Sequence, residues 1–232
     1  KYKMNTLNDI LSKEIEEFRE KGHKFLNKEM TVGEFRKVSG GMGVYAHRGG
    51  KEFVVRLRIP SGVARLSSLE QVYNWAKKYN LEKIHLTTRE SIQLHGISID
   101  AVCDIMQDGL TKGIYTRGAG GNFPRNVALN PLSGVQIGET FDVTPYALAA
   151  NAHYMSKIYT YNLPRKIKTA FSNTEEDSAH CTVTDLGFLA VENKGKRAFK
   201  LYIGGGLGRN PRKSVEFDEL IDEKDVYIVL KL

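Results

Sequence analysis

Basic and polar side chains recur at every second position in three short segments of this sequence. Arg56 and Arg58 lie in residues 51–59, where apolar and polar side chains alternate. Side chains two apart in a β-strand point to the same side of the sheet. Residues 83–88 and 91–95 alternate in the same way. The side chains predicted to share one polar sheet face are Arg56, Arg58, His85, Thr87, Gln93 and His95.

This face is predicted to bind an anion, because exposed faces of small sheets usually mix charges of both signs and this set contains no acid. A merely solvated face is the alternative. Arg125-Asn126 end a glycine-rich loop, where backbone N–H groups can approach a ligand and the arginine fork can hold an oxyanion. An arginine in a loop can also simply be solvated.

Two lysines form a third basic group. Lys166 and Lys168 lie two apart at the predicted start of a strand, so their ammonium groups repel each other unless an anion lies between them. Desolvation would lower the pKa of such groups enough for proton donation. Lysines that protect a sheet edge are the alternative explanation.

The run Gly204–Gly208 follows a predicted strand. It departs from the dinucleotide-binding fingerprint, because position 209 is Arg209 where that fingerprint needs glycine. The run can still cradle an anion with its backbone N–H groups, or form a plain turn.

The elements that position these residues fall into two units. A helix over residues 6–25, the strands 51–59, 83–88 and 91–95, a helix opened by a Ser67/Glu70 capping box and a helix over 100–107 predict the order β-α-β-β-α. With a last strand at 113–117, the unit is a ferredoxin-like split βαβ sandwich, in which both helices cover one sheet face. The apolar side chains expected beneath the helices are Phe53, Val55, Leu57, Leu69, Val72, Trp75, Ala76, Ile84, Leu86, Ile92 and Leu94.

The second predicted unit follows a loop over residues 118–134. A helix from Thr144 to about Tyr161 and strands at 167–172, 186–191 and 198–203 give it mixed α/β character. The predicted fold class is therefore α+β. Residues 1–50 are expected to form an N-terminal helix and linker, 51–120 the ferredoxin-like half-domain, and 121–232 the first part of a second domain.

The amino-acid composition indicates which classes of binding partner are favoured. Lys plus Arg outnumber Asp plus Glu by 34 to 27 in 232 residues, and the net charge of +7 favours anionic partners. No apolar run reaches the roughly 18 residues of a membrane span, so a cytoplasmic location is expected. Cys103 and Cys181 are predicted to be buried thiols without a metal. The apolar run at 226–232 indicates an unfinished element, and therefore a fragment.

Six ordered motifs resemble the siroheme-dependent assimilatory nitrite and sulfite reductase family over nearly the whole chain. They are Arg56-Leu57-Arg58-Ile59-Pro60, the segment from His85 to Gly96, Arg125-Asn126, Leu163-Pro164-Arg165-Lys166, Asp185-Leu186-Gly187-Phe188 and Gly204–Gly208. The resemblance implies siroheme coupled to a four-iron, four-sulfur cluster. It also implies six-electron reduction of sulfite to sulfide or nitrite to ammonia, with ferredoxin or a flavoprotein as electron donor.

Roles carry over by position from this resemblance. The anion-binding and proton-supplying residues would be Arg56, Arg125, Lys166 and Lys168. The residues expected to bind siroheme are Arg58, His85, Arg89, Gln93, His95, Asn126, Arg165, Gly205 and Gly206. This fits because siroheme bears many carboxylates, whose burial requires comparable positive charge and hydrogen-bond donors. Lys168 favours sulfite as the substrate, whereas His85 stands where sulfite-specific members often have arginine.

One departure from the family limits what this chain can do. The family's cluster is held by four cysteines in the C-terminal half, and the C-x-x-x-C part of that pattern does not occur here. Family members are roughly twice this length. The chain is therefore expected to be an N-terminal part that is inactive alone.

Two other functions remain open from sequence. A β-α-β-β-α-β unit with positive charge could be an RNA-recognition module, which stacks bases on sheet aromatics. The predicted polar face carries no aromatic side chain, and the similar stretch at 197–202 lies in the other unit. A non-catalytic relative that binds a tetrapyrrole is the second alternative.

Overall fold

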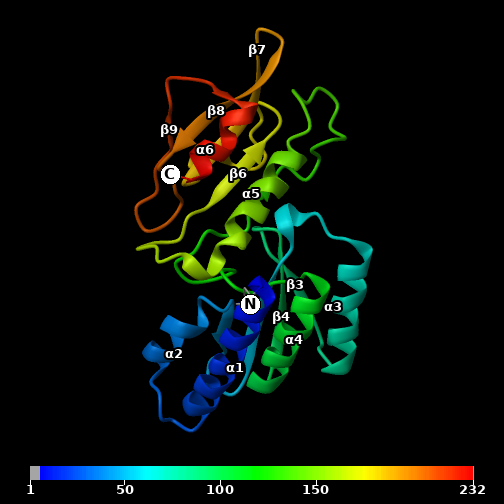
Figure 1. Cartoon of the computed structure of the whole chain (residues 1–232), viewed down its shortest axis with the longest axis vertical. Helices are drawn as coiled ribbons and strands as arrows, with labels where there is room; N and C mark the ends of the chain where they lie inside the picture. Colours follow the sequence, from blue (N-terminus) through cyan, green and yellow to red (C-terminus); the bar gives the residue numbers. More distant parts are fainter. Residues whose placement is uncertain (1–5, 232) are drawn as a thin grey trace, which may run out of the picture. The chain divides into compact units, whose positions relative to one another are not determined.

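The computed structural model describes residues 6–231. The chain folds into two compact units (Figure 1). The first unit contains the chain up to Ile59, then Val63–Phe123 and Ser156–Lys166. The second contains Pro60–Gly62, Pro124–Met155 and the chain from Ile167 onward. No helix within residues 6–231 combines the length and the apolar composition that crossing a bilayer would require.

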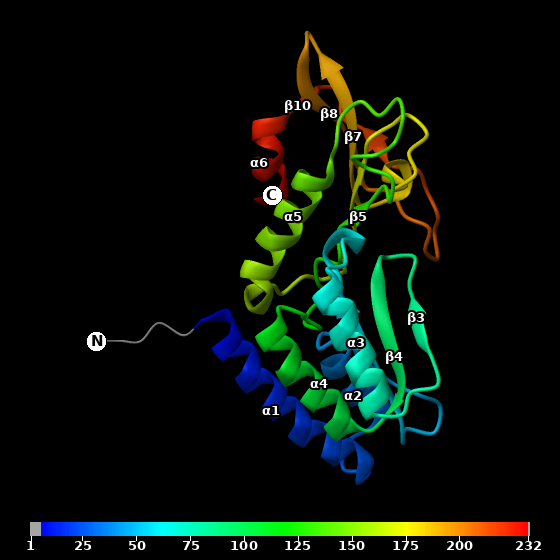
Figure 2. The same cartoon turned by 90° about the vertical axis from the view of Figure 1, so that its right-hand side faces the viewer.

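The first unit is a helix-covered antiparallel sheet, which confirms the predicted ferredoxin-like α+β class. Its strands run in the order β1-β2-β4-β3. Helices α1, α3 and α4 lie on one side of the sheet (Figure 2). The elements are α1 (Leu7–Leu26), α2 (Val32–Ser39), β1 (Val44–Ala46), β2 (Phe53–Arg58), α3 (Leu66–Lys78), β3 (Ile84–Leu86), β4 (Ser91–Ile97) and α4 (Ile99–Lys112).

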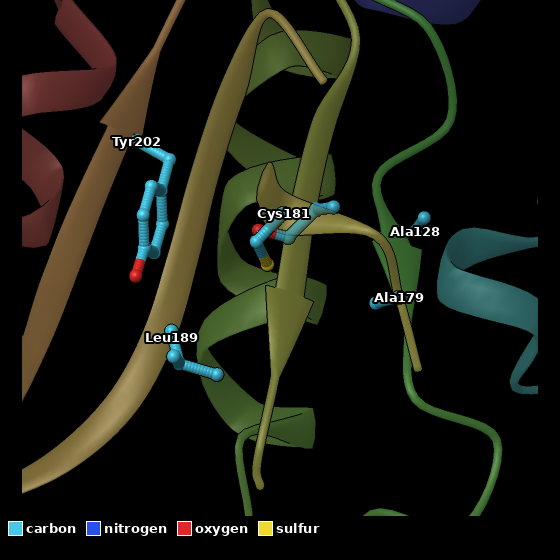
Figure 3. Close-up of a cluster of buried hydrophobic side chains, with 6 residues drawn as sticks. Ala128, Ala179, Cys181, Leu189 and Tyr202 are labelled. Carbon is cyan, nitrogen blue, oxygen red and sulfur yellow. The ribbon is translucent and has the colours of Figure 1, made fainter. Parts of the chain in front are cut away.

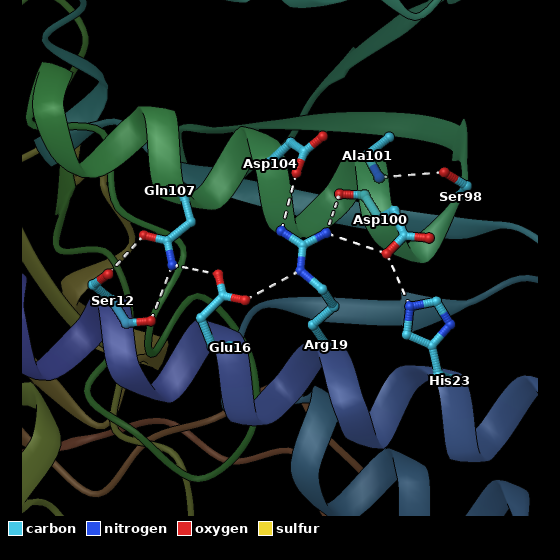
Figure 4. Close-up of polar contacts among 9 residues, drawn as sticks. All are labelled: Ser12, Glu16, Arg19, His23, Ser98, Asp100, Ala101, Asp104 and Gln107. Atoms are coloured by element: carbon cyan, nitrogen blue, oxygen red, sulfur yellow. Dashed lines mark hydrogen bonds and ion pairs between the residues drawn. The ribbon is translucent and has the colours of Figure 1, made fainter.

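Helix α1 begins with a capping box and is oriented by polar contacts with α4. Thr6 and Asp9 form a capping box, in which each side chain accepts a hydrogen bond from the other's backbone N–H. The polar side of α1 packs on α4 through Arg19, whose guanidinium donates to Asp104 at 3.0 Å and Asp100 at 3.2 Å (Figure 4). These contacts fix α1 against α4. Neither helix covers the opposite face of the sheet (Figure 2).

The strand predicted at 113–117 is wrong. Tyr115 makes only an isolated bridge with Arg58, because β1 already pairs with most of the same edge of β2. Val44 and Ala46 face Val55 and Phe53 across that ladder. Helix α2 and strand β1 were not expected from sequence, and β1 adds Tyr45 to the polar face, with His47 directly after the strand.

The expected burial of Ile84 and Leu86 is also wrong. Their register places them opposite Leu94 and Ile92, yet they are 46% and 71% exposed. Strand β3 is three residues long and forms the end of the sheet. Helix α3 turns its buried side towards α4 instead, where Trp75 Nε1 donates to Asp108 at 2.8 Å.

Two details of α3 differ from expectation. The helix begins after Arg65, which makes no side-chain cap, so Ser67 and Glu70 lie within the helix instead of capping it. Leu69 is exposed, while Val72 and Trp75 are buried as predicted. A short helix can start without a cap when packing holds its buried side, since tertiary contacts supply most of its stability.

The second unit has a mixed sheet in the order β10-β8-β7-β6-β5, with β9 paired to β8. Strands β5, β6 and β7 are parallel, and β7 and β8 form an antiparallel hairpin. The elements are β5 (Ala128–Leu129), α5 (Thr144–Ser156), β6 (Thr169–Ser172), β7 (Leu186–Asn193), β8 (Lys196–Ile203), β9 (Val215–Glu216), β10 (Ile221–Asp222) and α6 (Val226–Lys231). Short 3-10 helices cover Pro60–Gly62, Ile158–Thr160, Cys181–Val183 and Glu223–Asp225.

Aromatic rings form the core of the second unit. Phe171, Phe188 and Phe199 are fully buried, and the Phe171 and Phe188 rings stack with centroids 4.7 Å apart. Phe199 meets the ring of Tyr146 at 5.2 Å, which places α5 on this sheet face. A second cluster of buried side chains packs around the sheet (Figure 3). Its members are Ala128, Ala170, Ala179, Cys181, Leu189 and Tyr202. The three long strands predicted from sequence are confirmed, and the predicted helix ends five residues early, at Ser156.

Candidate functional site

The polar face of the first unit spans all four strands. Arg56 of β2 pairs with Gln93 of β4, which pairs with His85 of β3. Tyr45 of β1 pairs with Val54, whose partner in β4 is His95. The contribution of β1 was not predicted, although the side chains of Val44 to His47 alternate directly after a glycine turn. Tyr45 also places one aromatic ring on a face expected to have none.

Arg56 is held in a fixed orientation on this face. Its Nη1 donates to the Ala119 carbonyl at 3.2 Å. With the Gln93 amide oriented to satisfy both groups, the Gln93 oxygen accepts from Nη2 at 2.8 Å and Nε at 3.2 Å. The guanidinium lies over the Tyr45 ring, 5.7 Å from its centroid. An arginine held by neutral partners keeps its full charge for an anionic ligand.

Gly120 makes the packing around Tyr45 possible. A Cβ added at Gly120 would lie 2.3 Å from both the Gly40 carbonyl oxygen and the Tyr45 hydroxyl. The glycine therefore lets the 117–121 segment approach β1 closely. This segment also supplies the Ala119 carbonyl that holds Arg56.

Arg58 has the same parity in β2 as Arg56, but it is enclosed and not open to solvent. It is 3% exposed, and its backbone N–H donates to Tyr115 at 2.8 Å. Its Nη1 would lie 3.1 Å from a Cβ at Gly118. The alternation in β2 therefore predicts the side of Arg58 but not its burial.

Three histidine rings form a row on this face, which we call the histidine row: His47, His95 and His85. The ring centroids of His47 and His95 are 5.6 Å apart, and those of His95 and His85 are 6.2 Å apart. Burial, followed by the nearby His47, His85 and Lys83, lowers the pKa of His95. The Nε2 atoms of His47 and His95 are buried and have no hydrogen-bond partner among the described residues.

These orphaned nitrogens test whether the residues fit a group such as siroheme. A buried polar atom without a partner costs about 1–3 kcal/mol, and a carboxylate is the acceptor that an imidazole N–H favours. The histidine row contains no acid to fill that role. The chemistry of this face therefore fits a ligand that carries several carboxylates.

A tight turn between β3 and β4 positions Arg89. The Thr87 hydroxyl accepts hydrogen bonds from the backbone N–H groups of Arg89 and Ser91, at 3.3 and 3.1 Å. Glu90 adopts a left-handed conformation, with φ of 55°. Arg89 is half-buried at this corner.

The remaining residues of the first unit lie in its last segment. Arg165 is exposed and Lys166 is half-buried. Asn122 donates to the Pro164 carbonyl at 3.0 Å, which ties this segment to the end of the 117–123 loop. The strand β6 begins only at Thr169, so Lys166 precedes it instead of starting it.

The second unit places Arg125 and Lys168 on neighbouring segments, and Asn126, which follows Arg125, is buried. Pro124 and Ile167 form a parallel bridge, and the Arg125 N–H donates to Ile167 at 2.9 Å. Lys168 follows one residue later on the neighbouring strand, and its N–H donates to Asp185 at 2.8 Å. Arg125 and Lys168 thus lie on neighbouring segments of the chain, at one end of the parallel strands.

Gly205 and Gly206 use their backbone donors internally. The Gly205 N–H donates to Thr184 at 3.0 Å, and the Gly206 N–H donates to Arg212 at 3.0 Å. A Cβ at Gly205 would lie 2.2 Å from the Ser214 hydroxyl. These two N–H groups therefore do not form the anion cradle that the sequence suggested, and their place is a tight turn after β8.

Neither cysteine resembles a cluster ligand. Burial raises the pKa of the Cys103 thiol to about 12 and also raises that of Cys181. The Cys181 thiol donates to the carbonyls of Phe188 at 3.3 Å and Ala170 at 3.5 Å. No group of three or more His, Cys, Asp or Glu side chains within residues 6–231 could hold a metal ion.

Both thiols are expected to resist alkylation in the folded protein, because the reactive thiolate is disfavoured and buried. Iodoacetamide at pH 8 should modify neither Cys103 nor Cys181 until a denaturant is added, as counted by mass spectrometry of the peptides. Rapid native labelling of Cys181 would contradict the burial described here. Free cysteine in the same solution serves as the reactive control.

Two family models match this chain. A family model described as the nitrite/sulfite reductase ferredoxin-like half domain matches residues 45–110. Another, described as the nitrite and sulphite reductase 4Fe-4S domain, matches residues 120–231. The two models describe parts of one enzyme family and together cover most of the chain.

Known proteins similar to this chain are reductases. An assimilatory ferredoxin-dependent nitrite reductase of Haloferax mediterranei is 26% identical over 99% of this chain and 42% of its own length. A sulfite reductase [ferredoxin] of Mycobacterium tuberculosis is 30% identical over 69% of this chain and 29% of its own length. The solved structure of the Mycobacterium tuberculosis NirA protein superimposes with a TM-score of 0.75 at 24% identity, covering 95% of this chain and 44% of that one.

The chain spans less than half the length of these relatives. The order of the matched segments is that expected from the sequence motifs, with the ferredoxin-like part first. On these grounds the chain belongs to the nitrite and sulfite reductase family.

Proposed function

We propose that this chain is the N-terminal part of a reductase that carries siroheme and a four-iron, four-sulfur cluster and reduces sulfite or nitrite by six electrons. The observation that carries the proposal is the polar sheet face, where Arg56 is fixed by Gln93 and Ala119 beside the histidine row. In this proposal residues 51–120 supply the ferredoxin-like half-domain. Residues 121–232 supply the first part of the siroheme-binding domain, after an N-terminal helix and linker in residues 1–50.

Siroheme would be held by groups that match its carboxylates. The donors available on the first unit are arginine, histidine and glutamine side chains, which bind carboxylates with charge-assisted hydrogen bonds. The residues proposed for this role are Arg58, His85, Arg89, Gln93, His95, Asn126, Arg165, Gly205 and Gly206. Because Arg58 is buried and the two glycine N–H groups are used in their turn, those three would act by shaping the site.

The substrate would be bound and supplied with protons by Arg56, Arg125, Lys166 and Lys168. Sulfite and nitrite are anions, and their reduction consumes protons as well as electrons. Fixed cations lower the cost of placing such an anion in a desolvated site. Each lysine ammonium carries three N–H donors that can hydrogen-bond to a bound anion.

When bound, siroheme would supply the iron at which the substrate is reduced, and the cluster would supply the electrons. The cluster ligands are proposed to lie in the C-terminal half of the complete protein, because both cysteines here are buried and the C-x-x-x-C part of the family's pattern does not occur in this sequence. Ferredoxin is the proposed electron donor and the cytoplasm the proposed location. Both nitrite and sulfite reductases are among the relatives, so the proposal includes both substrates.

The experiment is reconstitution of the complete protein with siroheme and iron–sulfur assembly intact. We expect the protein to bind siroheme. We also expect it to reduce sulfite or nitrite when each is assayed with reduced methyl viologen as the donor. A protein that binds siroheme but reduces neither sulfite nor nitrite would support the second candidate, a non-catalytic tetrapyrrole-binding relative. RNA recognition is disfavoured, because the Phe199 ring of the stretch at 197–202 is fully buried.

A further inference from the structure

His47 is the one member of the histidine row that no sequence motif includes. It follows β1 directly, and its backbone N–H donates to Glu52 at 2.8 Å while its carbonyl accepts from Gly50 at 3.0 Å. These two bonds fix the start of the β1–β2 turn. The backbone therefore holds the imidazole in place on the polar face.

A β-bulge brings His95 to His47. The β2–β4 ladder passes from Phe53 opposite Ile97 to Val54 opposite His95, so Gly96 is the extra residue. Gly96 has φ of 74°, the left-handed conformation that a bulge of this kind uses. The two imidazole rings then meet edge to face, at an interplanar angle of 76°.

The charges around the pair are mostly positive. Lys83 lies just before β3 and His85 lies on it, while Arg56 lies on β2 and Arg48 on the β1–β2 turn. Glu52 is the nearby acid; its side chain is exposed and makes no hydrogen bond to either ring among the described contacts. Two buried, unpartnered nitrogens within a positive region are therefore suited to an anionic acceptor.

We propose that His47 and His95 bind one carboxylate group together, each donating a hydrogen bond from one ring nitrogen. Resting on the proposed function, that carboxylate belongs to siroheme, and its binding takes up a proton onto the pair. The proton follows from charge: burial and cationic neighbours lower the pKa of His95 and favour its neutral ring, whereas a bound carboxylate favours the imidazolium. Siroheme binding should then strengthen as the pH falls, by up to about tenfold per pH unit for one proton.

The test is a titration of the complete apoprotein with siroheme at pH 6, 7 and 8, followed by absorbance. His47→Gln keeps a hydrogen-bond donor but cannot be protonated, so we expect weaker binding at pH 6 and a shallower pH dependence than in the unchanged protein. His23→Gln is the matched control, because His23 is exposed on α1 and bonds to Asp100 at 2.9 Å. It should titrate like the unchanged protein.

A second measurement covers the case in which His47→Gln fails to fold. The ¹⁵N shifts of histidine-labelled, unchanged protein should change at the His47 and His95 rings and report the uptake of one proton when siroheme is added. If siroheme binds and neither the variant nor these shifts respond, the carboxylate site is refuted while the proposed function stands. If siroheme does not bind at all, both fail. Ring shifts produced by sulfite alone would show an oxyanion site instead and would also refute the proposal.

Discussion

Arg125→Ala in the complete reductase should lower the turnover of sulfite and nitrite by about 10²- to 10³-fold, the usual effect of removing one group that stabilises a developing anion. Siroheme content should stay close to that of the unchanged protein. The reason is the position of Arg125, which lies with Lys168 on neighbouring segments of the chain at one end of the parallel strands. Removal of the guanidinium takes away charge without removing the backbone bond to Ile167.

Turnover with methyl viologen and the siroheme absorbance per chain are the two measurements needed. Arg209→Ala is the control, because Arg209 is exposed in the turn after β8 and is assigned no role. Lys166→Ala should resemble Arg125→Ala, with turnover reduced more than cofactor content. Unchanged turnover in Arg125→Ala, or loss of siroheme in proportion to activity, would remove the assigned role.

Phe188→Ala should destabilise the second unit by about 3–5 kcal/mol, the cost of truncating a large buried aromatic side chain. Phe188 lies in the middle of β7, fully buried, and contacts the rings of both Phe171 and Phe199. A smaller side chain would leave a cavity between two strands and α5, which the stacked rings cannot fill.

The measurement is the exchange of the β7 and β8 amide hydrogens in increasing urea, since the chain has two units and a single global transition is not assumed. Phe217→Ala provides the matched control, because Phe217 is 45% exposed in the same unit and should change stability by less than about 1 kcal/mol. Equal protection in Phe188→Ala and the unchanged protein would show that the aromatic cluster is not the core described here.

Most of the fold that could be predicted from the sequence followed from the alternation of apolar and polar side chains in the strands. Strands β2 and β4 both alternate over at least five residues, so the pairing of Arg56 with Gln93 follows from parity and register. Strand β1 has only three residues, and its signal was lost in the glycine turn before it. The exposure of Leu86 depends on where α3 packs, which the Trp75–Asp108 hydrogen bond decides and local sequence does not.

The candidate site shows the same division. Residue type and spacing located the basic groups, because charge on one sheet face is visible in the sequence. Burial and hydrogen bonding decided their roles: Arg58 is enclosed, Gly205 uses its donor in a turn, and His47 joins His95 through a bulge. These outcomes depend on segments distant in sequence, such as 115–120 and 212–214.

The most direct test of the central claim is the visible absorption spectrum of the complete protein, purified after expression with siroheme synthesis intact. The proposal predicts a Soret band with the weaker bands of siroheme and the cluster, and turnover of sulfite or nitrite with reduced methyl viologen. A colourless protein would contradict it, because the polar face around Arg56 and His95 would then have to serve another anion.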